Sequence, residues 1–110
     1  LFTLVNKREN RKYPESYRWV PRQAIRTLLA LGERVNDPEV LKAVTCPVLL
    51  THPVGDDAAS PKAAERAVNA MASTEKRMVW LEKSNHLFFW DYDAEQAEQE
   101  VVRFLKSLNL

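Results

Sequence analysis

Two nearly continuous apolar runs in the second half of the chain predict two buried strands, at residues 46–52 and 78–81. Continuous rather than alternating hydrophobicity is typical of strands that are covered on both faces of a parallel sheet. Between the runs, Ser60 and Pro61 predict a helix start, because serine caps a helix and proline fits its first turn. Strand, helix and strand in this order predict a parallel, right-handed βαβ unit. The inward stripe of this helix is expected to be Ala64, Ala67, Val68 and Met71.

Two further helix starts precede the first strand. Pro21 predicts one of them, and a turn or frayed end is expected near Gly32. Asp37 followed by Pro38 predicts a second, short helix. Residues 1–20 are irregular, basic and aromatic, and we expect a connecting or lid segment there rather than a core element. The first helix carries one apolar stripe, formed by Ile25, Leu28, Leu29 and Val35.

The last predicted helix begins at Asp93. Gln96 follows three residues later, and the pair resembles a capping box in which Asp replaces Ser or Thr. Two strands rarely form a stable sheet by themselves, so further strands are expected from outside this chain. Since the sequence begins with Leu1 and not with Met, we expect an upstream part. The apolar stripe of the last helix is predicted to be Ala94, Ala97, Val101, Phe104, Leu105 and Leu108.

Composition and charge exclude several classes of function. The chain has 110 residues, 45% hydrophobic and 28% charged, as in an ordinary single globular domain. No apolar run approaches the roughly 18 residues of a membrane span, so no stable membrane insertion is expected. Cys46 is the one cysteine; it is expected in the core, and its isolation favours a reducing, cytoplasmic setting. Residues 1–26 hold seven Lys or Arg against two acids, but no nucleic-acid-binding motif accompanies them, so we expect a solvated surface and no nucleic-acid partner.

Candidate chemistry lies in the loops that follow the two strands. Asp56 and Asp57 follow the first strand, and His86 follows the second. Parallel strands end at the same sheet edge, so one of these aspartates can approach the histidine. An aspartate that accepts the Nδ1–H of a histidine fixes its tautomer and stabilises its imidazolium form. Histidine and aspartate side chains can also bind metal ions. The spacing of His52, Asp56, Asp57 and His86 matches no standard metal motif, however, and no metal is expected.

Three ordered segments resemble the C-terminal part of an α/β-hydrolase. They are residues 45–50 (TCPVLL), residues 55–61 (GDDAASP) and residues 80–86 (WLEKSNH). The likeness is greatest to the carboxylesterase, monoacylglycerol lipase and lysophospholipase branches. The resemblance implies an α/β fold with an incomplete sheet, in which residues 1–37 are the end of a cap or lid segment and the helix after it. Residues 38–110 are then the C-terminal βαβα part of the hydrolase core.

The resemblance also implies roles for individual residues. His86 is expected to be the catalytic base, and Asp56, which Pro61 follows five positions later, is expected to be the acid that orients it. The implied activity is that of a serine carboxylester hydrolase acting on a small-molecule acyl ester without a cofactor. Leu87, Phe88 and Trp19 are expected to line the substrate site.

The sequence departs from the family pattern in three ways. Asn85 stands where glycine is frequent, and Ala59 stands where a larger aliphatic residue is common. No G-x-S-x-G motif occurs, since neither Gly32 nor Gly55 flanks a serine. The N-terminal half with the nucleophile and the oxyanion loop is therefore expected to be absent, and this chain alone is expected to be inactive.

Two other functions remain open from the sequence. The chain could be a non-catalytic, truncated α/β-hydrolase piece that associates with another chain, as a homo-oligomer or with the missing N-terminal half, because an unpaired strand edge invites pairing. Alternatively, it could belong to an α/β-hydrolase of different chemistry, such as a dehalogenase, a peptidase or a thioesterase. The residues encoded upstream would distinguish these hypotheses.

Overall fold

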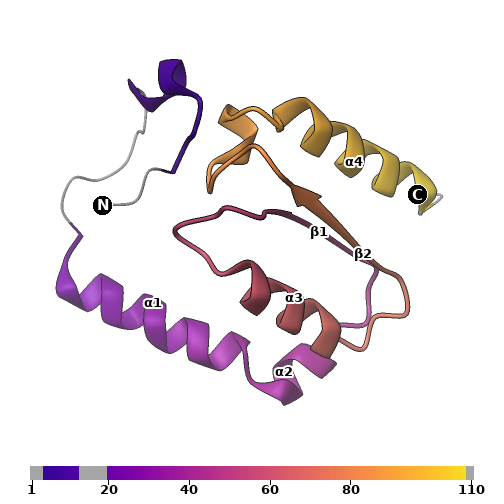
Figure 1. The fold of residues 1–110 in the computed structure, drawn as a ribbon. Coiled ribbons are helices and arrows are strands. Elements are labelled where there is room, and N and C mark those ends of the chain that lie inside the picture. The colour runs from indigo at the N-terminus through magenta and orange to yellow at the C-terminus, as the bar shows by residue number, and fades with distance from the viewer. Residues whose placement is uncertain (1–3, 13–19, 109–110) are drawn as a thin grey trace.

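A strand pair with helices on its two sides forms the centre of the molecule (Figure 1). The computed structural model describes residues 4–12 and 20–108. Figure 1 shows α4 on one side of the strands, and α3, with α1 and α2 beyond it, on the other side. In chain order the elements are η1 (Arg8–Lys12), α1 (Arg22–Val35), α2 (Pro38–Lys42), β1 (Val48–Pro53), α3 (Pro61–Ala70), β2 (Lys76–Leu81), η2 (Phe88–Trp90) and α4 (Ala94–Ser107).

The strands β1 and β2 pair in parallel, and α3 connects them. The register runs from Val48 opposite Lys76 to Pro53 opposite Leu81. The predicted βαβ unit is therefore confirmed. The expectation that both faces of the strands are fully covered is wrong for the described residues, because only the last residue of each strand is buried. Among the described residues the sheet has these two strands alone, and it is therefore incomplete.

Two of the helix starts follow directly from their capping residues. Asp37 accepts a hydrogen bond from the backbone N–H of Glu39 at 2.9 Å, and α2 begins at Pro38. The Ser60 hydroxyl accepts one from the backbone N–H of Ala63 at 3.3 Å, which starts α3. Both predicted starts are confirmed, since each side chain satisfies an N–H group that has no partner inside the helix.

Helix α1 differs from the prediction in its end and in its surroundings. It begins at Arg22, directly after Pro21, and continues through Gly32, so the expected turn there is wrong. The carbonyl of Gly32 accepts the backbone N–H of Asn36 at 3.2 Å and its side-chain Nδ2–H at 2.7 Å, which extends the helix to its end. No residue of α1 is buried, and its apolar stripe lies exposed.

Helix α4 begins where predicted, but without the predicted cap. The Asp93 carboxylate makes no capping bond; its Oδ2 accepts the backbone N–H groups of Lys83 and Ser84 at 2.8 and 2.9 Å. The capping-box prediction is wrong because these two loop donors occupy the carboxylate. Of the predicted stripe, Ala97 and Phe104 are buried, whereas Leu105 is exposed.

The buried apolar residues lie around the end of β2 and on both flanking helices. Cys46 precedes β1 and is exposed, so its predicted place in the core is wrong.

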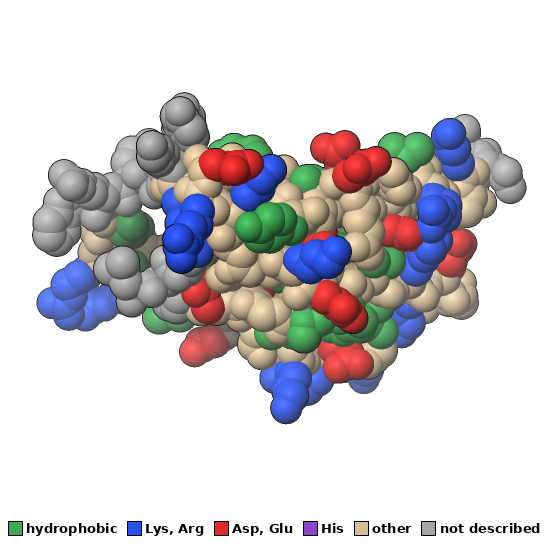
Figure 2. Space-filling model, turned by 45° about the horizontal axis from the view of Figure 1, so that its top comes forward, with side chains coloured by type: hydrophobic (Ala, Val, Ile, Leu, Met, Phe, Trp, Pro, Cys, Tyr) green, Lys and Arg blue, Asp and Glu red, His purple; other side chains and the backbone are tan. Residues whose placement is uncertain are grey.

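On the face drawn in Figure 2, Lys and Arg side chains are interspersed with Asp and Glu side chains. No helix in residues 4–12 and 20–108 has the length and hydropathy that crossing a membrane requires. Among the described residues the buried hydrophobic side chains are Val5, Val68, Leu81, Ala97 and Phe104.

Candidate active site

His86 and Asp56 meet at the edge where both strands end. The ring Nδ1 of His86 lies 2.9 Å from Oδ2 of Asp56 and 3.2 Å from its Oδ1. A carboxylate can only accept, so Nδ1 carries the proton of this hydrogen bond. The Asp56 side chain is 2% exposed and the His86 side chain is 41% exposed. The two residues that the sequence singled out are thus brought together, one buried and one open to solvent.

The Asp56 carboxylate is held by its own loop. Its Oδ1 accepts the backbone N–H groups of Ala58 and Ala59, both at 2.8 Å. Burial raises the pKa of Asp56, but the hydrogen bond from His86 and those from Ala59 and Ala58 together outweigh it, and the pKa lies below its ordinary value. Asp56 is therefore ionised at neutral pH. The backbone of Ala59 makes this contact, so the small side chain at that position does not weaken it.

His52 lies near the same carboxylate, toward the oxygen that also contacts His86. Its Nδ1 is 2.9 Å from the carbonyl oxygen of Pro53, and its Nε2 is 3.8 Å from Oδ2 of Asp56. The ring of Trp80 lies tilted beside it, with centroids 6.2 Å apart. Within the described part of the chain, no three His, Cys, Asp or Glu side chains are arranged to hold a metal ion.

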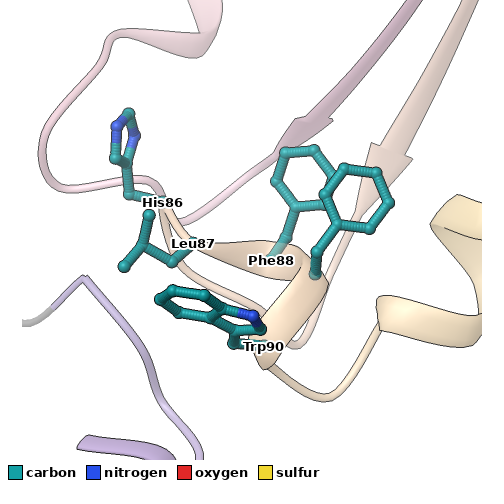
Figure 3. Close-up of a pocket in the computed structure, with 5 residues that line it drawn as sticks. His86, Leu87, Phe88 and Trp90 are labelled. Carbon is teal, nitrogen blue, oxygen red and sulfur yellow. The ribbon is translucent and has the colours of Figure 1, made fainter. Parts of the chain in front are cut away.

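An apolar cavity of about 300 Å³ adjoins His86 (Figure 3). Leu87 and Phe88, which the sequence predicted at the substrate site, line it together with Phe89 and Trp90. The rings of Phe88 and Phe89 pack at a centroid distance of 4.6 Å. Trp19, the third predicted residue, lies outside the described residues.

Two buried aspartates fix the loop between β2 and η2, which carries His86. The sequence did not reveal their contacts with this loop. The first is Asp93, whose carboxylate binds the loop as described above and whose own N–H donates to the Ser84 hydroxyl at 2.8 Å. Ser84 is 1% exposed, and its contacts with Asp93 shape the turn before His86.

The second is Asp91, which accepts four backbone N–H groups. Its Oδ2 binds those of Asn6 and Asn85 at 2.6 and 2.9 Å. Its Oδ1 binds those of Lys7 and Tyr92, both at 2.9 Å. Burial raises the pKa of Asp91, but the donors Asn6, Asn85, Lys7 and Tyr92 together lower it below its ordinary value.

These contacts correct the expectation for the N-terminal segment. Residues 4–12 lie against the His86 loop: the backbone N–H of Leu87 donates to the carbonyl of Leu4 at 2.8 Å, and Val5 is buried. This part of the segment packs as a core element rather than as a separate lid. The rest of the predicted lid, residues 13–19, lies outside the described residues.

Two of the solved structures that resemble this chain are those of lipolytic enzymes. One is reported for the metagenome-derived lipolytic enzymes LipS and LipT; it has a TM-score of 0.73 and 32% sequence identity over 83% of this chain. The other is the monoacylglycerol lipase of Paleococcus ferrophilus, with a TM-score of 0.83 and 18% identity over 96% of this chain. This chain spans 37% and 42% of the length of these two structures. No protein-family model matches the chain.

These likenesses confirm the fold class that the sequence suggested. The chain has the lipase- and esterase-like fold of the C-terminal part of an α/β-hydrolase, with an incomplete sheet. The division into residues 1–37 and 38–110 stays a prediction.

Proposed function

We propose that this chain provides the base and the acid of a Ser-His-Asp triad in a serine carboxylester hydrolase. His86 is the base, and Asp56 is the residue that orients it. The observation that carries this proposal is the 2.9 Å contact between Nδ1 of His86 and Oδ2 of Asp56, where two parallel strands end. The likeness to lipolytic enzymes supports the same reaction class.

The geometry suits proton transfer at Nε2 of His86. Because Nδ1–H is bound to Asp56, the lone pair of the neutral ring lies on Nε2, which makes no hydrogen bond within residues 4–12 and 20–108. In the first step Nε2 takes the proton of the serine hydroxyl as the serine oxygen attacks the ester carbon. It then returns this proton to the alcohol that leaves. Asp56 stabilises the imidazolium that exists between these two events.

A water molecule completes the cycle. Nε2 removes a proton from the water, whose oxygen attacks the acyl-serine, and the acid is released as the proton returns to the serine oxygen. The serine and the oxyanion donors are supplied from outside this sequence, which contains no G-x-S-x-G motif. This chain alone is therefore expected to show no turnover.

The cavity beside His86 is proposed to receive the acyl group. Its walls, Leu87, Phe88, Phe89 and Trp90, are apolar, and its volume of about 300 Å³ suits an acyl chain of modest size. Trp19 is proposed as a further wall on the strength of the resemblance. The substrate is thus a small-molecule acyl ester, and no cofactor takes part.

The partner is proposed to be the rest of the hydrolase sheet. The half-exposed strands and the exposed apolar stripe of α1 leave apolar surface that further strands and helices would cover. The isolated, exposed Cys46 favours a reducing compartment, and we therefore propose a cytoplasmic setting.

The proposal is tested in the protein expressed together with the residues encoded upstream of this chain. With a short-chain nitrophenyl ester, we expect turnover in the wild type and a loss of about 10³-fold or more in kcat for His86→Ala. Glu98→Ala, on the exposed surface of α4, serves as the matched control and should keep wild-type rates. Near-normal turnover in His86→Ala would reject the triad. Turnover of a thioester, amide or haloalkane in place of the ester would reject the carboxylester assignment.

A further inference from the structure

The side chain of Asn85 lies between the two loops that carry Asp56 and His86. Its Oδ1 accepts the backbone N–H of His86 at 2.8 Å and the backbone N–H of Asp57 at 3.2 Å. The residue is only 4% exposed. One buried oxygen therefore links the backbone next to the acid with the backbone of the base.

The orientation of this amide is determined by its surroundings. Its Nδ2 lies 3.5 Å from Oδ1 of Asn6, while its Oδ1 faces two N–H donors. A flipped amide would point its NH₂ group at those donors and lose both bonds. The backbone N–H of Asn85 is bound in turn by Asp91, which also binds the backbone of Asn6 and Lys7.

This bridge spans the acid loop and the base loop. Along the chain the two loops are separated by α3 and β2, and at the site itself hydrogen bonds join them directly. Two of these are the hydrogen bond between Asp56 and His86 and the bridge through Asn85. A shift of about 1 Å between acid and base can lower a rate by about 10²-fold, so a fixed separation has a direct consequence for catalysis.

We infer that Asn85 is a positioning residue that holds the acid loop in register with the base loop. Its catalytic meaning rests on the proposed function, whereas its structural effect does not. Glycine, which is frequent here in the family that the sequence resembles, has no side chain and could not make this bridge. The side chain that departs from the family pattern therefore adds a hydrogen-bonded link between the two loops.

The inference is tested by ¹⁵N NMR of the imidazole rings in the 110-residue chain, which has two histidines. In the wild type we expect the neutral ring of His86 to be a single Nδ1–H tautomer, because Asp56 accepts that proton. Asn85→Leu keeps the branched shape of the side chain but has no acceptor, and it should give a mixture of tautomers. Asn85→Asp keeps the acceptor for both N–H groups and should restore the single tautomer. Asp56→Ala marks the signal of a ring that has lost its partner.

The outcomes separate this inference from the proposed function. A single Nδ1–H tautomer retained in Asn85→Leu would overturn the inference, as would a mixture in Asn85→Asp. The amide resonances of β1, β2 and α4 show whether a variant remains folded. If the leucine variant does not fold, Asn85→Gly, which introduces no bulk, replaces it in the comparison. In the longer protein, kcat should fall by about 10²-fold in Asn85→Leu with little change in KM. Absence of ester turnover in the wild-type protein would reject the proposed function and leave the tautomer result unaffected.

Discussion

Asp91 is the residue that ties the start of the described chain to the His86 loop. Its carboxylate binds the N–H groups of Asn6 and Lys7, which lie 85 and 84 positions away in the sequence. It also binds the N–H of Asn85 within the loop itself. One buried charge thus satisfies backbone donors from two segments that would otherwise be left without partners.

The lowered pKa of Asp91 predicts a stability that depends on pH. A carboxyl group whose pKa is lower in the folded state stabilises the fold above its unfolded pKa of about 3.9. This contribution is lost as the pH falls through the folded pKa. Asp91→Asn should therefore reduce the free energy of unfolding by about 1–3 kcal/mol at pH 7, where hydrogen bonds to a charged acceptor are lost.

The measurement is urea unfolding of the wild type and of Asp91→Asn at pH 7 and again below pH 3. The difference between the two proteins should shrink at the lower pH, because protonation removes the same charge from the wild type. An equal difference at both pH values would show that the charge of Asp91 is not what stabilises the loop.

Single residues differ in how far the sequence reveals them. The positions of His86 and Asp56 follow from two parallel strands that end at one edge, so their meeting could be predicted. Asn85 could be noticed only as a departure from glycine, and nothing in the sequence tells which donors its amide binds. Asp91 gave no signal, because its partners are backbone N–H groups and such groups look alike at every position.

At the level of elements, local capping chemistry decides where α2 and α3 begin. The Ser60 hydroxyl caps α3, and removal of such a cap typically costs about 1 kcal/mol. Ser60→Ala should lower the free energy of unfolding by that amount and should speed amide exchange at Ala63. Thr74→Ala, which removes a hydroxyl at an exposed position before β2, is the control and should stay within about 0.5 kcal/mol. Unchanged stability and exchange in Ser60→Ala would contradict the cap.

The incorrectly predicted cap of α4 was decided by tertiary contacts. Asp93 stands where a cap is expected, but its carboxylate binds the N–H groups of Lys83 and Ser84 instead. Those donors belong to a loop whose path cannot be read from local pattern. The end of α1 was instead decided locally: Gly32 weakens a helix only modestly, and the bonds from Asn36 to its carbonyl continue α1 past it.

At the scale of the molecule, the described residues form an incomplete, two-stranded sheet. Its two strands are half-exposed, and α1 has no buried residue. The chain spans 37% and 42% of the two lipolytic structures that it resembles. The missing G-x-S-x-G motif had already predicted an incomplete enzyme. The packing of residues 4–12 against the His86 loop could not be predicted, because it depends on contacts across some 80 residues that no local pattern records.

The pairing of Asp56 with His86 is the central claim, and comparison of the two neighbouring acids tests it most directly. In the protein that includes the upstream residues, kcat/KM for a short-chain ester is measured in Asp56→Asn and in Asp57→Asn. Asparagine keeps the size of each side chain and removes its charge. We expect a loss of about 10⁴-fold for Asp56→Asn, because the imidazolium loses its stabilising partner, and less than about tenfold for Asp57→Asn. A larger loss in Asp57→Asn than in Asp56→Asn would contradict the account.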